Sequence, residues 1–124
     1  MKKAITGSPL EWAERAAEAA LFKKGSEVLV IKVKQTLVIV DYFVLANASN
    51  PLQLNAVVEA VEEGLRKDYG VKPIGREGLT SNTWVLLDYG DIVVHVFTPE
   101  TRDYYRLESL FNDAEITRYD DSLL

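Results

Sequence analysis

One stretch decides the fold: Thr83-Trp84-Val85-Leu86-Leu87-Asp88-Tyr89-Gly90-Asp91-Ile92-Val93-Val94-His95-Val96-Phe97. Two apolar, β-branched runs flank the polar segment 88–91, a pattern typical of a β-hairpin. A two-residue loop at Tyr89 and Gly90 predicts three opposed pairs, namely Leu87 with Ile92, Val85 with Val94, and Trp84 with His95. A bulge at Gly90 is the alternative, and it would shift one strand by one residue.

Because side chains alternate along a strand, the hairpin has two different faces. One face is purely aliphatic and is predicted to belong to the core; it carries Val85, Leu87, Ile92, Val94 and Val96. The other face carries Trp84, Leu86, Asp88, Asp91, Val93, His95 and Phe97. An ordinary core does not explain this mixture of aromatic, imidazole and carboxylate groups.

The composition limits the classes of function. The 124 residues suit one domain, and 48% of them are hydrophobic and 27% charged. A net charge of -5 argues against sequence-independent nucleic-acid binding, which depends on Lys and Arg. The absence of cysteine excludes disulfides and thiolate sites. No apolar run approaches the roughly 20 residues of a membrane span, and no signal peptide is evident, so the cytosol is the expected compartment.

Three segments combine a capping residue with a following proline, which predicts helix starts. The pairs are Ser8–Pro9, Asn50–Pro51 and Thr98–Pro99. Glu11 and Gln53 stand at the positions that complete a capping box. The first helix is expected to end near Gly25 and the second at Gly70, whereas the third continues through Phe111.

Apolar runs predict strands over 28–33 and from Tyr42 onward. A short run at 71–74 contains Pro73 and is expected at a sheet edge, with a polar loop over 75–82. The order of elements predicts a single-domain α/β fold over residues 1–124, with helices covering the aliphatic sheet face. The core is expected over about 8–114, followed by a polar C-terminal tail at 115–124.

Candidate catalytic chemistry is sparse. His95 is the only histidine, and it could pair with Asp88 or Asp91 or pack against Trp84. The two aspartates could hold a divalent cation through oxygen ligands, but aspartates around a Tyr-Gly turn are also ordinary turn residues. The glycine spacing fits neither common phosphate-binding motif.

Aromatic and arginine side chains are concentrated in the hairpin and the third helix. They are Trp84, Tyr104, Tyr105 and Phe111, with Arg102 and Arg106. These residue types dominate binding energy at protein interfaces, although a second layer of core is the alternative. Adjacent tyrosines on a helix point about 100° apart. At least one of Tyr104 and Tyr105 is therefore expected to be exposed.

Three segments closely resemble the ribosomal silencing factor family, also called Iojap-like. They are Asp41-Tyr42-Phe43-Val44, the segment from Trp84 to Phe97, and Arg102-Asp103-Tyr104-Tyr105-Arg106-Leu107-Glu108. The resemblance extends from about Leu10 to Ala114. It implies a nucleotidyltransferase-like α/β fold, with a mixed sheet and helices packed on it, and no known catalytic activity, cofactor or metal.

The resemblance also implies a function. Such factors bind the large ribosomal subunit through its protein numbered fourteen and obstruct joining of the small subunit. Translation is thereby repressed when nutrients are scarce. The free protein is expected to be a cytoplasmic homodimer, without sequence-specific nucleic-acid binding or membrane attachment.

The family pattern implies a set of partner-binding residues. Trp84 and Tyr105 match positions expected to contact the ribosomal protein. Further matches, as contact or supporting residues, are Asp88, Asp91, His95, Arg102, Leu107 and Glu108. Many members have a Thr-Gly pair and a Ser-x-Arg motif before the central helix, where this chain has Asn47-Ala48 and Leu52. Because of this difference, the resemblance implies no function for the loop at residues 47–53.

Two other hypotheses compete with this one. A metal-dependent nucleotidyltransferase-like enzyme would use Asp88 and Asp91, and would bind magnesium or nucleotide. A homodimeric scaffold unrelated to ribosomes would dimerise in solution without co-sedimenting with large subunits.

Overall fold

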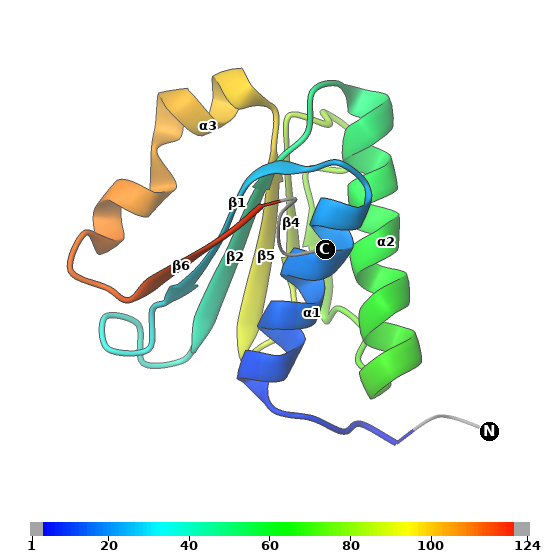
Figure 1. Cartoon of the computed structure of the whole chain (residues 1–124), viewed down its shortest axis with the longest axis vertical. Coiled ribbons are helices and arrows are strands. Elements are labelled where there is room, and N and C mark those ends of the chain that lie inside the picture. Colours follow the sequence, from blue (N-terminus) through cyan, green and yellow to red (C-terminus); the bar gives the residue numbers. More distant parts are fainter. Residues whose placement is uncertain (1–3, 121–124) are drawn as a thin grey trace.

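The structure, a computed structural model that describes residues 4–120, is an α/β fold built on one mixed sheet (Figure 1). Six strands lie in the order β3-β4-β5-β2-β1-β6. Only β2 and β5 pair in parallel among these neighbours; the other pairs are antiparallel. The strands are β1 (Ser26–Lys32), β2 (Tyr42–Asn47), β3 (Gly75–Glu77), β4 (Trp84–Asp88), β5 (Ile92–Phe97) and β6 (Ile116–Tyr119). The predicted α/β class with a mixed sheet is confirmed.

The helices begin where the capping signals predict. They are α1 (Pro9–Phe22), α2 (Pro51–Tyr69), α3 (Pro99–Tyr105) and a 3₁₀ segment, η1 (Leu107–Phe111). Ser8 and Glu11 form the predicted capping box, and Asn50 Oδ1 accepts a hydrogen bond from the Gln53 amide at 2.9 Å. In the part of the chain that the structure describes, no helix is long and apolar enough to cross a membrane.

Gln53 has a different role from the predicted one. Its Oε1 accepts from the Ser49 amide at 2.6 Å, so it does not complete a capping box with Asn50. Its Nε2 donates to the carbonyl oxygens of Lys23 and Lys24, at 3.1 and 2.9 Å. This side chain therefore ties the start of α2 to the end of α1.

One face of the sheet is covered by α1 and α2 (Figure 1). A first cluster of buried side chains joins these helices to the aliphatic hairpin face, and all five predicted residues belong to it: Val85, Leu87, Ile92, Val94 and Val96. Gly64 on α2 leaves room for the Arg15 guanidinium of α1. A Cβ on Gly64 would lie 2.9 Å from the guanidinium carbon of Arg15.

The opposite face carries a second cluster, formed by Leu29, Ile31, Val33, Phe43, Leu45, Val93, Phe97 and Phe111. Side chains from η1 and from the β1–β2 loop pack against it. Trp84 and Leu86 stay half-buried on this face. The mixed face is thus covered at its centre and open along β4.

The hairpin register differs from both predicted alternatives. Trp84 pairs with Phe97 and Asp88 with Val93, a shift of two residues from the two-residue loop. The wider turn is held by a hydrogen bond from the Gly90 amide to Asp88 Oδ1 at 2.8 Å, and Gly90 has a φ of 85°. Tyr89 is turned into the first cluster and is buried. Because the shift is even, the predicted division into two faces is preserved.

Three other elements depart from the expectations. The strand predicted at 71–74 begins instead at Gly75, although β3 does lie at the sheet edge. The third helix does not run through to Phe111; it stops at Tyr105 because Arg106 adopts a left-handed conformation with a φ of 46°. An unpredicted strand, β6, pairs with β1 and lies within residues 115–124, which were expected to form a polar C-terminal tail. Residues 121–124 of that tail lie outside the described residues.

Replacing Asn50, the N-cap residue of α2, should moderately lower the stability of the protein. Asn50→Ala removes the side-chain acceptor for the Gln53 amide, so the free energy of unfolding should fall by about 1 kcal/mol. Asn55→Ala, at an exposed interior position of α2, is the matched control and should not destabilise the protein. Urea denaturation measures both. Equal stability of the two variants would contradict the capping role.

Candidate functional site

The outer part of the candidate site is an aromatic platform formed by Trp84, Tyr104 and Tyr105. The Trp84 and Tyr105 rings lie 5.0 Å apart between centroids, and the Tyr104 and Tyr105 rings 4.9 Å apart. Tyr104 is 80% exposed and Tyr105 is 56% exposed. The prediction that at least one of these tyrosines is exposed is confirmed. The two residues predicted to contact a partner, Trp84 and Tyr105, lie side by side.

Trp84 joins this platform to the core. Its indole N–H donates a hydrogen bond to His95 Nδ1 at 3.1 Å, and its ring lies 5.0 Å from that of Phe97. The His95 ring in turn makes an edge contact with Phe43 at 4.7 Å. Of the alternatives considered for His95, packing against Trp84 is the observed one.

His95 is held in its neutral form. Only 3% of its surface is exposed, and burial, assisted by the nearby Arg102 charge, lowers its pKa to about 4. Since Nδ1 accepts the indole hydrogen, the neutral ring carries its proton on Nε2. The histidine therefore orients the indole and adds no positive charge to the site near pH 7.

The conformation of Gly78 determines the path of the backbone just before Trp84. Gly78 has a φ of 85°, and a Cβ placed on it would collide with the carbonyl oxygen of Trp84. Only glycine tolerates both conditions. The loop before β4 can therefore cross close to the start of that strand.

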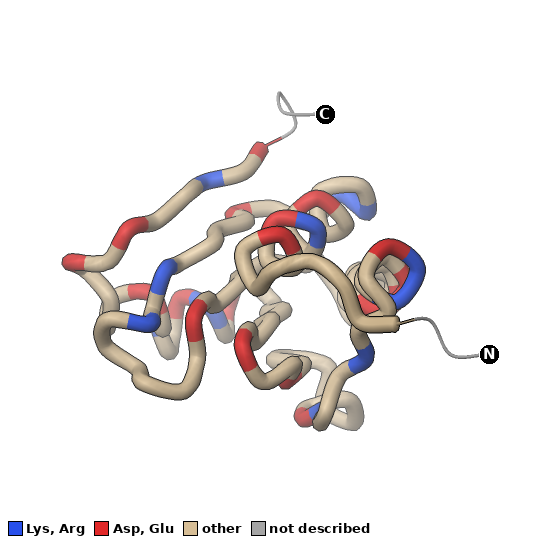
Figure 2. The backbone as a smooth tube through the Cα atoms, turned by 90° about the horizontal axis from the view of Figure 1, so that it is seen from below, with Lys and Arg blue, Asp and Glu red and all other residues tan. Residues whose placement is uncertain are grey.

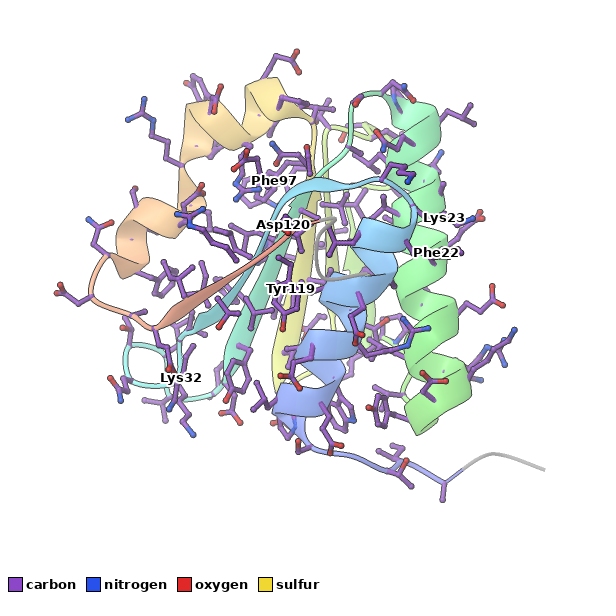
Figure 3. The ribbon with its side chains drawn as sticks, in the orientation of Figure 1. Phe22, Lys23, Lys32, Phe97, Tyr119 and Asp120 are labelled. Carbon is purple, nitrogen blue, oxygen red and sulfur yellow. The ribbon has the colours of Figure 1, made fainter. Side chains whose placement is uncertain are left out.

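Arg102 holds together the segment that carries Tyr105. It is 5% exposed and forms an ion pair with Glu108, with Nε to Oε2 at 3.0 Å. One terminal nitrogen donates to Asn47 Oδ1 at 2.7 Å and to the Glu27 carbonyl at 3.0 Å. The guanidinium also lies over the ring of Phe97, which points toward α3 (Figure 3). We call this group the Arg102 clamp.

The remaining predicted site residues separate into two groups. Glu108 belongs to the Arg102 clamp, and Leu107 packs half-buried against the second cluster. Asp88 and Asp91 lie at the β4–β5 turn, at the other end of β4 from Trp84. Asp88 accepts the turn hydrogen bond from Gly90, and Asp91 is exposed. The structure therefore does not bring these two aspartates into the platform.

The aspartates have the environment of turn residues. Within residues 4–120 there is no group of three or more His, Cys, Asp or Glu side chains arranged to hold a metal ion. The observed contact of Asp88 is the turn hydrogen bond that the simpler interpretation predicts.

Sequence reasoning missed three structural residues of this site. Asn47 and the Glu27 carbonyl complete the Arg102 clamp, and Gly78 shapes the approach to Trp84. Asn47, a polar residue at the end of the apolar run of β2, is a sequence feature that could have indicated a buried polar contact. The Glu27 contact uses a backbone oxygen at an irregularity in β1, so its side chain carried no signal.

The architecture and the platform define a small α/β protein with an exposed aromatic surface. A family model described as "Ribosomal silencing factor during starvation" matches residues 6–123. The chain belongs to this ribosomal silencing factor family. The family is described by a regulatory role rather than by a reaction.

Individual relatives agree with this assignment. The chain is 31% identical to the ribosomal silencing factor of Bacillus subtilis, over 85% of this chain and 88% of that protein. It is also 31% identical to a mouse protein named "Mitochondrial assembly of ribosomal large subunit protein 1", over 82% of this chain and 44% of the mouse protein. A crystal structure of a Chromobacterium violaceum protein has 33% identity and a TM-score of 0.80, covering 84% of this chain and 86% of that one.

Removing the Arg102 side chain should strongly destabilise the protein. Arg102→Ala leaves the buried Asn47 amide and the half-buried Glu108 carboxylate without their partner, so the free energy of unfolding should fall by roughly 3 kcal/mol. Arg106→Ala removes the same atoms from an exposed position and should cost about 1 kcal/mol or less. Thermal and urea unfolding compare the two. A similar small loss for both would show that the clamp is dispensable.

His95 should make stability depend on pH. Its folded pKa of about 4 lies below its usual value of 6.5, so between these values the unfolded chain binds more protons. Stability should therefore fall as the pH drops from 6.5 to 4, by at most roughly 3 kcal/mol from this residue. His95→Gln keeps a hydrogen-bond acceptor but does not titrate. At low pH the stability of the variant relative to wild type should therefore rise. A stability difference that does not change with pH would refute the lowered pKa of His95.

Proposed function

We propose that this protein binds the large ribosomal subunit through ribosomal protein fourteen and sterically blocks joining of the small subunit. Translation would thereby be repressed under nutrient limitation. The observation that carries the proposal is the aromatic platform, in a chain that belongs to the ribosomal silencing factor family. The name of the mouse relative, which refers to the large subunit, supports the choice of subunit.

The platform has the properties of a binding hot spot. Trp84 and the tyrosines offer large, rigid rings with few rotatable bonds, which lose little entropy when they are covered. The hydrogen bond to His95 and the tilted ring contact with Phe97 already hold the indole in place. A partner would therefore meet a surface that needs little rearrangement.

The charge of the chain suits a basic protein partner better than bare RNA. Acidic residues exceed basic ones by 19 to 14. Along the described backbone the two signs are interspersed, without one continuous basic stripe (Figure 2). Such a stripe is the usual footprint of phosphate binding. We therefore propose a protein-mediated contact with the ribosome, made in the cytoplasm by a factor that is a homodimer when free.

Steric exclusion requires no reaction at the site. A bound factor needs only to occupy a position that the small subunit must approach and to dissociate slowly. Affinity is therefore the property on which the proposed repression depends.

The platform residues should be needed for ribosome binding. Trp84→Ala and Tyr105→Ala should each weaken co-sedimentation with purified large subunits by about thirtyfold or more, the loss expected for a hot-spot residue. Phe22→Ala is the matched control, since Phe22 is 71% exposed and lies at the end of α1 beside α2 (Figure 3). That control should bind normally.

Folding and function can be separated in this experiment. Tyr105→Ala should leave the circular dichroism spectrum unchanged because the side chain is exposed, whereas Trp84→Ala also removes packing. Trp84→Phe keeps an aromatic ring and gives a second test at that position. Full ribosome binding by folded Tyr105→Ala and Trp84→Ala variants would refute the proposed surface.

A further inference from the structure

One carboxylate borders the open face of β4. This face carries a row of half-buried side chains, Trp84, Leu86 and Asp88. On the neighbouring edge strand β3, Glu77 lies opposite Leu86. Directly opposed residues of an antiparallel pair project to the same face of the sheet. The exposed Glu77 side chain therefore lies beside Leu86 and diagonally next to Trp84.

The residues on either side of Glu77 support this placement. Arg76 lies opposite Leu87, whose side chain belongs to the first cluster, and its Nε contacts Glu62 Oε1 of α2 at 2.6 Å. Arg76 thus projects to the face that the helices cover, and it is not available to neutralise Glu77. On the other side, Gly78 fixes the backbone against the Trp84 carbonyl. The end of β3 is consequently held in place.

No cation of the described chain balances the Glu77 carboxylate. Within residues 4–120 it takes part in no ion pair. On the other side of β4, Leu86 pairs with His95, which is buried. The imidazole there is neutral near pH 7 because burial lowers its pKa to about 4. The apolar part of the β4 row thus has a carboxylate on one side and an uncharged ring on the other.

Other charges around the open face occur in both signs. Arg102 is paired with Glu108. Next to the tyrosines, Arg106 and Asp103 are both exposed, and Arg106 Nε donates to the Asp103 carbonyl at 3.3 Å. The end of the sheet with the β1–β2 loop also carries both signs: Asp41, Asp91, Lys32 and Lys34. The unbalanced negative charge beside the platform is therefore at the β3–β4 edge.

A partner that covers Trp84 and Leu86 must also remove water from Glu77. The Cβ atoms of opposed residues lie about 5 Å apart, and diagonal neighbours roughly 7–8 Å. A carboxylate that loses its water without gaining a cation is strongly disfavoured. A neutral or anionic group at this position would thus oppose docking, whereas a cation would complement the carboxylate.

We propose that Glu77 is a specificity-determining residue of the docking surface, and that its carboxylate pairs with a lysine or arginine of the same ribosomal protein. This inference rests on the proposed function. Apolar side chains next to that cation would cover Trp84 and Leu86. Glu77 thereby selects a basic protein surface and disfavours RNA, whose phosphates it repels.

Two substitutions of Glu77 test this pairing in the full chain. In a binding titration with purified large subunits, Glu77→Gln should weaken binding by about tenfold and Glu77→Lys by about a hundredfold or more. Glu59→Lys is the matched control, because it changes the net charge equally at an exposed position of α2. It should bind like the wild type. All three variants should keep the wild-type circular dichroism spectrum and unfolding midpoint.

The salt dependence gives a readout that a purely structural role of Glu77 would not change. Added salt screens charge pairs that water can reach. The difference in affinity between wild type and Glu77→Gln should therefore become smaller as the salt concentration rises. A difference that stays constant would overturn the ion pair.

Tyr105→Ala, measured beside these variants, separates this inference from the proposed function. Weak binding by both Glu77 variants and by Tyr105→Ala, with normal binding by Glu59→Lys, supports the inference. Normal binding by the Glu77 variants with weak binding by Tyr105→Ala overturns it and leaves the proposed function standing; Glu77 would then only protect the edge of β3 from pairing. If no variant loses affinity, both proposals fail.

Two further outcomes would also overturn the inference. An equal loss for Glu59→Lys and Glu77→Lys would show that net charge, rather than a local pair, controls binding. Tighter binding by Glu77→Lys would show that an anionic group, such as an RNA phosphate, approaches this edge of the sheet.

Discussion

The rest of the site depends on the buried guanidinium of Arg102. This one group connects η1 through Glu108, the end of β2 through Asn47, and the irregular start of β1 through the Glu27 carbonyl. Arginine suits this position because its planar fork offers several fixed donors and its charge persists at every physiological pH. A buried charge with such partners is costly to disrupt. The Arg102 clamp therefore stabilises α3, a helix of seven residues that is too short to be stable in isolation.

A series of aromatic contacts connects the Arg102 clamp to the exposed platform. Arg102 lies over Phe97, Phe97 packs at a tilt against Trp84, and Trp84 contacts Tyr105. The depressed pKa of His95 keeps its ring neutral, so the acceptor for the indole persists throughout the physiological range. An exposed aromatic surface is thus supported by an inner layer with few alternative arrangements. Pre-organisation of this kind lowers the entropic cost of association.

Sequence patterns predicted those features that depend on local chemistry. Helix starts followed from Ser8–Pro9 and Asn50–Pro51, and the division of the hairpin into two faces followed from alternation. That division was correct although the register was wrong, because a shift of two residues returns each side chain to the same face. The early end of α3 at Arg106 could not be predicted, since a left-handed arginine has no sequence signature. The partners of Arg102 lie 55 and 75 residues away, and only the tertiary fold brings them together.

A factor that acts by steric exclusion places specific demands on its structure. It needs no reactive groups, but its surface must be broad enough to bind firmly and rigid enough to dissociate slowly. In this fold α1 and α2 pack on one sheet face, largely through alanine and aliphatic side chains. On the proposed function, the other face is the one that carries a partner. That face is closed at its centre by η1 and is open along β4. On the proposed function, the unequal covering of the two faces is itself the adaptation, because it gives a small protein a firm support beneath an exposed docking surface.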